Sequence, residues 1–108
     1  KGFSPIGNNE INFTGNFNGN GYKVDSLFIS RENEDYVGFF GYTFEAEIKN
    51  IGITNCDISG KAYVGGLVGY NFSSTIRISY STGSVKGDHI VGGLIGNNHH
   101  FSKIIKHS

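Results

Sequence analysis

The carboxylates are the side chains of this 108-residue chain that could carry acid–base chemistry. Two carboxylates on one face would suit glycoside hydrolysis, in which one group donates a proton and the other acts as base or nucleophile. The nine acids are Glu10, Asp25, Glu32, Glu34, Asp35, Glu45, Glu47, Asp57 and Asp88. When the chain is aligned on its internal repeat, no two of them fall on adjacent units of one face. We therefore expect no catalytic residue and no enzymatic activity.

The four histidines are the next candidates, because imidazole is a common metal ligand. His99 and His100 are adjacent, so they would point to opposite sides of an extended strand. Nothing in the spacing brings His89 or His107 beside them. The Asp-rich turns of calcium-binding β-rolls are absent as well. The sequence predicts no metal site and no cofactor.

A group of aromatic and amide side chains could contact a sugar. Tyr42, Tyr70 and Phe72 offer amphipathic or apolar rings, and Asn71 offers an amide beside them. These residue types are also ordinary in turns and at strand edges, so a structural role is the alternative. The single Cys56 excludes an internal disulfide and is expected to be a half-buried strand residue, with an interchain or reactive thiol as the alternative.

The element that must position these side chains is a glycine-rich motif that occurs three times. It reads YVGGLVG at residues 63–69, IVGGLIG at 90–96 and, in a shorter form, YVGFFG at 36–41. Gly38, Gly66 and Gly93 are equivalent in this alignment, with spacings of 28 and 27 residues. A period in this range marks a repeat architecture, in which each unit buries its apolar face against its neighbours.

The composition favours strands. The chain has 17 Gly, 12 Asn and 13 Ile but only 3 Leu, 2 Ala and no Met or Trp, so helix-forming residues are scarce. Each unit contains three short strand signals separated by turn residues: one begins at residues 24–29, 48–53 or 76–80, one lies around Ile58 or Val85, and the third is the glycine-rich strand. We predict an all-β fold, a parallel β-helix (β-solenoid) of about three and a half rungs of about 27 residues, right-handed.

The repeat also predicts boundaries within a single domain that is a fragment of a longer chain. We expect a cap or atypical first turn at residues 1–23, followed by repeats at 24–47, 48–75 and 76–103 and a partial repeat at 104–108. The partial repeat would leave a strand edge open, and such an edge invites pairing with another chain. Ile104 and Ile105 are therefore candidates for an end-to-end contact.

Stacked repeats predict ladders of contacts between equivalent residues. The expected apolar ladders are Leu27 with Ile51 and Ile78, Ile29 with Ile53 and Tyr80, Ile58 with Val85, and Phe40 with Val68 and Ile95. The expected polar neighbours are a surface row of Asp25, Lys49 and Arg77, together with Asp57 near Ser84 and Asp88 near Lys61.

The charge pattern excludes two classes of partner. Nine basic and nine acidic residues cancel, and no basic patch is present that could neutralise the phosphates of a nucleic acid. The apolar runs span a few residues, far short of the roughly 20 needed to cross a bilayer. We expect neither nucleic-acid binding nor membrane insertion.

The motifs GLVG at residues 66–69 and GLIG at 93–96 resemble the GLUG-motif repeats of bacterial surface and secreted proteins, including non-catalytic regions of IgA-protease-type and adhesin-like chains. GFFG at 38–41 departs by replacing Leu with Phe. The resemblance implies an extracellular or cell-surface β-solenoid without catalytic residues.

The function predicted from the sequence is that of a non-catalytic stalk, spacer or adhesin region. Its partners would be the rest of a longer solenoid, other copies of itself, or host or surface glycans and proteins. Two alternatives are a structural subunit of an end-to-end filament, and a non-catalytic part of a glycan-active β-helix protein.

Overall fold

The computed structural model describes residues 2–99 and 103–107, and in this part of the chain every regular element is a strand. The strands are β1 (Asn16–Asn18), β2 (Lys23–Asp25), β3 (Phe28–Ser30), β4 (Phe40–Phe44), β5 (Glu47–Lys49), β6 (Gly52–Ser59), β7 (Ala62–Gly65), β8 (Val68–Phe72), β9 (Thr75–Lys86), β10 (His89–Gly92), β11 (Ile95–His99) and β12 (Lys103–His107). The prediction of an all-β fold is confirmed.

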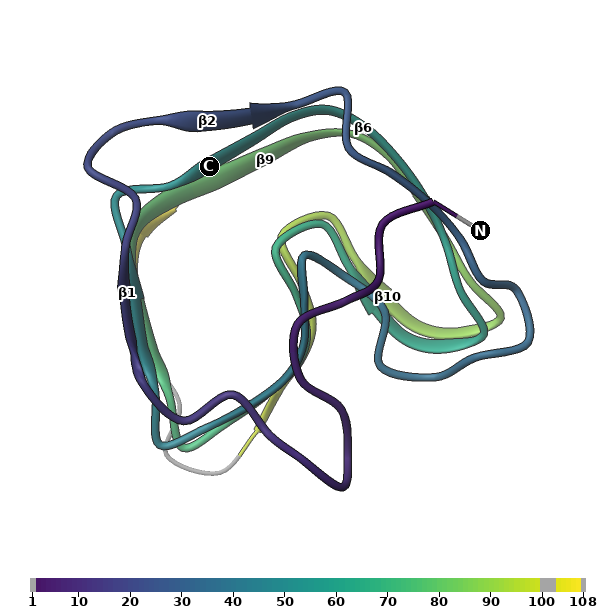
Figure 1. The fold of residues 1–108 in the computed structure, drawn as a ribbon, viewed down its shortest axis with the longest axis horizontal. Helices are drawn as coiled ribbons and strands as arrows, with labels where there is room; N and C mark the ends of the chain where they lie inside the picture. Colours follow the sequence, from purple (N-terminus) through teal and green to yellow (C-terminus); the bar gives the residue numbers. More distant parts are fainter. Residues whose placement is uncertain (1, 100–102, 108) are drawn as a thin grey trace.

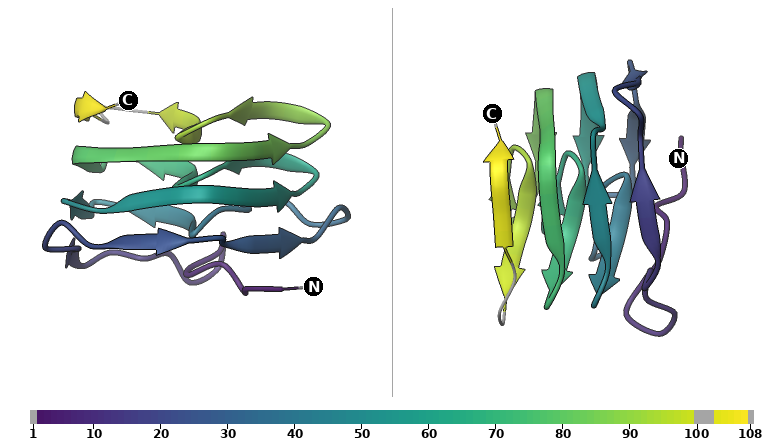
Figure 2. Two further views of the ribbon diagram at one scale, coloured as in Figure 1. Left: turned by 90° about the horizontal axis from the view of Figure 1, so that it is seen from above. Right: turned by 90° about the vertical axis from the view of Figure 1, so that its left-hand side faces the viewer.

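The strands pair in parallel and form three sheets. The largest has the order β1-β5-β9-β6-β2, with β12 added to β9 and β3 added to β6. The second is β10-β7, and the third is β11-β8-β4. Figure 1 shows successive passes of the chain lying over one another, where a pass is one traverse of the three sheets. In Figure 2 the same passes form layers that follow the sequence from one end of the molecule to the other.

The register of the sheets repeats the period of the sequence. Ile48 lies opposite Ile76, 28 residues later, and Val68 lies opposite Ile95, 27 residues later. Phe40 lies opposite Val68 on the other side. The predicted ladder of Phe40, Val68 and Ile95 is therefore confirmed, because the glycine-rich motifs fix its alignment without ambiguity.

A second group of ladders differs from the prediction by several residues. Ile58 does lie opposite Val85, as expected, but Ile29 lies opposite Ile58 and not opposite Ile53. Ile53 is instead paired with Val24 on one side and with Ser81 on the other. The reason is a bulge in β6, where the register against β9 shifts between Ile53 and Cys56.

The predicted ladder of Leu27 and Ile51 is also wrong. The Leu27 carbonyl accepts a hydrogen bond from the Asp57 amide at 2.8 Å, so Leu27 lies beside the second half of β6. Tyr80, assigned to the ladder of Ile29 and Ile53, lies opposite Gly52. The side chain of Ile78 lies outside the part of the chain that the structure describes.

The corners of successive passes use the same left-handed backbone conformation. Tyr36, Tyr63 and Ile90, each just before Val-Gly in the motif, have φ values of 62°, 58° and 53°. Glu45 and Ser73 repeat the feature at another corner, with φ values of 49° and 51°. Left-handed conformation is unfavourable for residues with a side chain. Its recurrence at equivalent positions indicates that the stack imposes the same turn on each pass.

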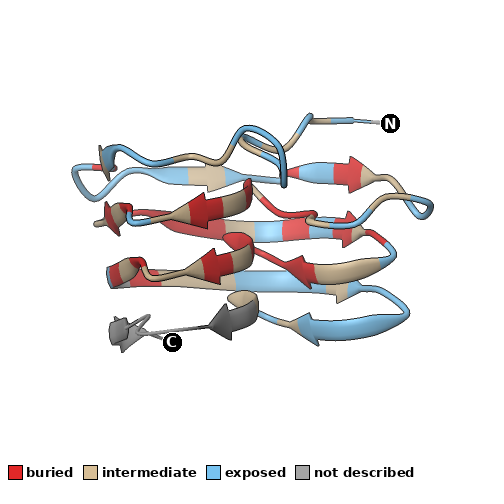
Figure 3. Cartoon of the chain, turned by 90° about the horizontal axis from the view of Figure 1, so that it is seen from below, coloured by how far each residue is buried: buried red, intermediate tan, exposed pale blue. Residues whose placement is uncertain are grey.

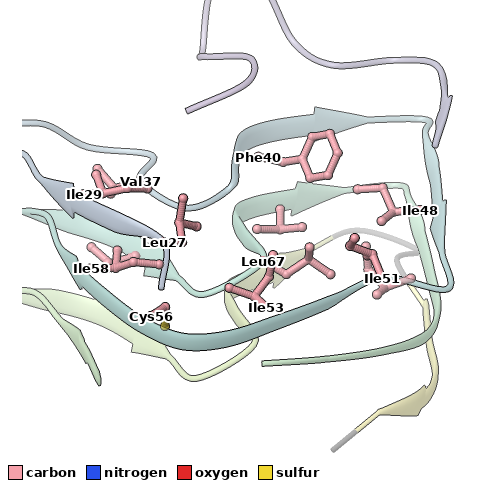
Figure 4. Packing of buried hydrophobic residues seen from close by; sticks show 13 residues of the cluster. Leu27, Ile29, Val37, Phe40, Ile48, Ile51, Ile53, Cys56, Ile58 and Leu67 are labelled. Carbon is pink, nitrogen blue, oxygen red and sulfur yellow. The ribbon is translucent and has the colours of Figure 1, made fainter. Parts of the chain in front are cut away.

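The core lies between the sheets and runs through the stack. Its fully buried side chains include Ile29, Phe40, Ile48, Ile53, Ile58, Val64, Leu67, Val68 and Ile76. Figure 3 shows that the buried positions gather on the middle passes, and Figure 4 shows the side chains packing into the space between the layers. Leu67 and Val68 are both 0% exposed. The chain bends between β7 and β8, so both members of this apolar pair can be buried.

The N-terminal segment covers one end of the core. The Ile6 amide donates to the Phe39 carbonyl at 3.0 Å, and the Phe3 ring stacks on the Phe39 ring at a centroid distance of 5.1 Å. The Phe13 ring packs on Phe40 at 4.8 Å. Figure 1 shows this segment crossing the passes beneath it. Further along, Phe17 in β1 lies opposite Ile48, so part of the predicted cap already pairs as the later passes do. The predicted domain boundaries stay predictions.

Candidate functional site

Four tyrosines gather where the second and third sheets meet, and we call them the tyrosine cluster: Tyr36, Tyr42, Tyr63 and Tyr70. Tyr42 and Tyr70 lie directly opposite each other on β4 and β8, and their rings stack with centroids 4.6 Å apart at 17°. Tyr36 and Tyr63 also stack, at 5.2 Å and 6°. The two stacks touch, since the Tyr63 and Tyr70 rings meet edge to face at 5.0 Å.

The backbone explains why the two stacks meet. Val37 and Val64 form a parallel bridge and are both 0% exposed, which leaves the tyrosines before them on the outer side. The left-handed conformation of Tyr36 and Tyr63 turns the chain at the same point. The bend at Gly66 then reverses the chain into β8, which carries Tyr70 back toward Tyr63. The cluster is therefore a product of the glycine-rich motif itself.

The electrostatics of the cluster keep its phenols neutral. Burial raises the pKa of Tyr36 above its ordinary value of 10.0, and the neighbouring Tyr63 and Tyr42 hydroxyls raise it further. Burial likewise raises the pKa of Tyr70. All four rings are half-buried. Chemically, the cluster offers stacked neutral phenols with part of each ring exposed, an arrangement suited to packing, hydrogen bonding or one-electron oxidation.

The structure brings together three of the four residues predicted to contact a glycan. Tyr42, Tyr70 and Phe72 are half-buried on one side, with the Tyr70 and Phe72 ring centroids 6.3 Å apart. Asn71 points the other way and is 0% exposed. Thr43 Oγ1 donates a hydrogen bond to Asn71 Oδ1, and Asn71 Nδ2 donates to the Ser74 carbonyl at 3.2 Å. Asn71 therefore belongs to the interior.

Sequence reasoning missed Tyr36 and Tyr63, which complete the cluster. A signal was present, because both residues occupy the position before Val-Gly in the repeated motif. The third motif has Ile90 at this position, with 48% of its surface exposed. The stack of tyrosines therefore extends over the first two motifs.

The predicted charge row is only partly formed. Lys49 lies opposite Arg77 as expected, and Arg77 Nη1 approaches Glu47 Oε2 at 4.0 Å. Asp25 lies opposite Thr54 instead, because the register of the first pass differs from the prediction. Its carboxylate accepts hydrogen bonds from Thr54 Oγ1 at 2.7 Å and Asn55 Nδ2 at 3.0 Å. These bonds, the Thr54 bond foremost, lower the pKa of Asp25.

The other predicted polar neighbours are present, and they border a polar hollow. Asp57 lies opposite Ser84, and the Asp88 amide donates to the Lys61 carbonyl at 2.7 Å. The hollow has a volume of about 540 Å³ and is lined by Glu32, Asn33, Ser59, Gly60, Lys86, Gly87 and Asp88. It contains two carboxylates with a lysine, a balanced charge set that the linear alignment did not bring together.

Metal and cysteine chemistry find little support in the described residues. In residues 2–99 and 103–107, no group of three or more His, Cys, Asp or Glu side chains is placed to hold a metal ion. His100 and the side chains of His99 and His107 lie outside the described part. Cys56 is free and more buried than predicted, with 4% of its surface exposed. Burial raises the pKa of its thiol, which disfavours the reactive thiolate.

The residues predicted for an end-to-end contact lie on β12. Ile104 is opposite Ile76 and Ile105 is opposite Arg77, so the backbone of β12 continues the parallel pairing. Their side chains lie outside the described part of the chain. Within that part, no helix is long and apolar enough to cross a membrane.

Comparison with known proteins identifies the repeat. Residues 60–86 match the family described as the GLUG motif, and these residues are a GLUG-motif region. The chain is similar to halomucin of Haloquadratum walsbyi, with 38% identity over 99 residues, which are 88% of this chain and 1% of that protein. It is also similar to a protein of Evansella cellulosilytica named as a Gly-rich membrane protein, with 36% identity over 86 residues, or 76% of this chain and 10% of that protein. No solved structure matches.

Proposed function

We propose that this chain is a section of a parallel β-solenoid that serves as a non-catalytic spacer or stalk of a surface or secreted protein. The observation that carries the proposal is the in-register parallel pairing of residues 27 to 29 apart, as in Val68 with Ile95 and Ile29 with Ile58. A chain that returns to the same face with each repeat can be extended by whole repeats without changing the packing of those already present.

The geometry suits a spacer because each pass contributes length at little cost in sequence complexity. Parallel strands lie about 4.8 Å apart, so each added pass would lengthen the stack by about that distance. The chain spans only 1% and 10% of the two similar proteins, so it corresponds to a small region of large chains. Their names, halomucin and a Gly-rich membrane protein, support a surface setting, and we propose an extracellular or cell-surface location.

An insertion of whole repeats tests the spacer directly. Four extra copies of residues 48–75 inserted after residue 75 should lengthen the particle by about 19 Å, four times the strand spacing. Small-angle X-ray scattering would measure the maximum dimension, and the thermal unfolding transition should stay cooperative. A control insert of the same length made of Gly and Ser should add a flexible loop and no ordered length. An unchanged dimension, or loss of the cooperative transition, would contradict the proposal.

A second candidate is glycan contact by an adhesin region, favoured by the partial exposure of Tyr42, Tyr70 and Phe72 at one place. The mutual stacking of Tyr42 and Tyr70 leaves their edges rather than both faces for a sugar. A glycan array comparing the wild type with Phe72→Ala tests this candidate: it requires binding that the substitution reduces at least tenfold. We propose no catalysis, so incubation with polysaccharides should release no product.

Assembly into a filament is a third candidate, carried by the strand edge at β12 and its residues Ile104 and Ile105. In such a filament one copy would add to the opposite end of the next. The N-terminal segment already occupies that end with Phe3 and Phe13. The filament therefore requires the segment to move aside. Deletion of residues 1–12 should promote assembly if a filament forms, and light scattering would detect the increase in mass.

A further inference from the structure

We propose that Tyr42 and Tyr70 are a site of oxidative cross-linking, at which one-electron oxidation joins the two rings as dityrosine and links adjacent passes covalently. The proposal goes beyond the spacer function, since it concerns a modification of the chain.

The two rings are placed for coupling. Tyr42 and Tyr70 are direct neighbours in the register of β4 and β8, and their centroids lie 4.6 Å apart with planes 17° from parallel. This is the shortest centroid distance between tyrosines in the described part of the chain. Reacting groups held in contact behave as if at very high concentration, so coupling within the pair should outpace coupling between molecules.

The surroundings of the pair favour the radical step. The Tyr36 ring lies 5.1 Å from Tyr42, and the Tyr63 ring lies 5.0 Å from Tyr70. An oxidant that removes an electron from any ring of the tyrosine cluster therefore meets a chain of rings in contact. Both Tyr42 and Tyr70 are half-buried, so part of each ring is accessible to an oxidant while the stacked faces exclude other reactants.

The chemistry balances with hydrogen peroxide as oxidant and a haem peroxidase as catalyst. Each phenol loses one electron and one proton and becomes a phenoxyl radical. The two radicals form a carbon–carbon bond between ring positions ortho to the oxygens, and loss of the ortho hydrogens to the phenolic oxygens restores both aromatic rings. The pair loses two hydrogens overall, and these reduce one hydrogen peroxide to two waters.

The link would stabilise the stack by restricting the unfolded chain. It would close a loop between residues that are 28 apart in sequence. Cross-links that close loops of this length remove conformational entropy from the unfolded state. We expect the urea midpoint of the cross-linked protein to rise by roughly 1–2 M.

The test treats the folded protein, at low concentration, with a haem peroxidase and hydrogen peroxide. Dityrosine fluorescence should appear in the monomer, and mass spectrometry of a digest should identify a Tyr42–Tyr70 peptide pair that has lost two hydrogens. Tyr42→Phe and Tyr70→Phe each keep a ring in the stack but remove its phenol, and each should reduce this peptide pair at least tenfold. Circular dichroism of each variant establishes that it is folded.

Tyr22→Phe is the matched control, because Tyr22 is 75% exposed and distant in sequence from the motif. It should leave the Tyr42–Tyr70 pair unchanged. The proposal is overturned if the folded wild type yields dityrosine only between molecules, if the product disappears with Tyr22→Phe, or if no Tyr42–Tyr70 pair forms.

Discussion

Gly66 and Gly93 occupy the same position in two copies of the motif, yet the structure predicts opposite effects of alanine at the two sites. A Cβ atom added at Gly66 would lie 2.5 Å from the Gly93 carbonyl oxygen and would collide with Ser81 Oγ. A Cβ atom added at Gly93 would meet nothing within 4 Å among the described residues. The difference arises because one pass lies over Gly66 and none of the described chain lies over Gly93.

The cost at Gly66 follows from the contacts that must open. Ordinary contact begins near 3.4 Å, so the carbonyl of Gly93 must retreat by nearly 1 Å. This movement strains the hydrogen bonds from the Gly66 amide to the Gly93 carbonyl, 3.0 Å, and from the Leu67 amide to the Leu94 carbonyl, 2.9 Å. Overpacking costs about 1–3 kcal/mol, and a weakened hydrogen bond adds about 1 kcal/mol. We expect Gly66→Ala to lower the free energy of unfolding by about 2–4 kcal/mol and Gly93→Ala to change it by less than about 0.5 kcal/mol.

Urea and thermal unfolding followed by circular dichroism would measure both variants. The melting temperature of Gly66→Ala should fall by roughly 10–25 °C, while that of Gly93→Ala should stay within a few degrees. Ser81→Gly removes one of the two collisions at Gly66, so the double variant should lose less than the sum of the single losses. Equal losses for Gly66→Ala and Gly93→Ala would refute the stacking on which the argument rests.

Three further predictions follow from single positions. Asn71→Ala should cost about 2–4 kcal/mol in urea unfolding, because it removes two buried hydrogen bonds and leaves a cavity, while the exposed Asn33→Ala should cost less than about 0.5 kcal/mol; similar losses would contradict the internal role of Asn71. Stability should fall as the pH rises above 10.0, the ordinary pKa of tyrosine, because the unfolded chain ionises before the raised folded-state pKa of Tyr70 is reached; Tyr70→Phe should reduce this alkaline loss, and an unchanged pH profile would contradict it. Ile90→Asn should raise the free energy of unfolding by about 1 kcal/mol by relieving the left-handed strain at φ 53°, and a loss of stability would contradict that reason.

The repeat period, the all-β class and the ladder through Phe40, Val68 and Ile95 could be predicted from the sequence. The paired glycines mark the motif unmistakably, and equivalent residues of a parallel stack must lie over one another. The ladders of Ile29 and Ile53 could not be predicted in the same way. Alternating apolar residues fit several registers, and the bulge between Ile53 and Cys56 selects among them.

The candidate site was predictable in part. Tyr42 and Tyr70 stand out because both belong to the repeat, and their stacking follows directly from its period. Tyr36 and Tyr63 join them only through a left-handed turn, which the residue types do not announce. Asn71 was assigned to the surface because amides are usually exposed. Its burial depends on Thr43, the residue opposite on β4, whose hydroxyl supplies a hydrogen bond.

The central claim is that each pass pairs in parallel with the next at a fixed register, and scalar couplings across hydrogen bonds would test it most directly by NMR. The structure predicts a coupling between the Phe40 amide and the Leu67 carbonyl, 2.8 Å apart, and another between the Leu67 amide and the Leu94 carbonyl, 2.9 Å apart. Detection of both couplings would establish two successive contacts of the stack at the 27-residue period. Couplings from these amides to carbonyls at another register, or to an antiparallel neighbour, would contradict the account.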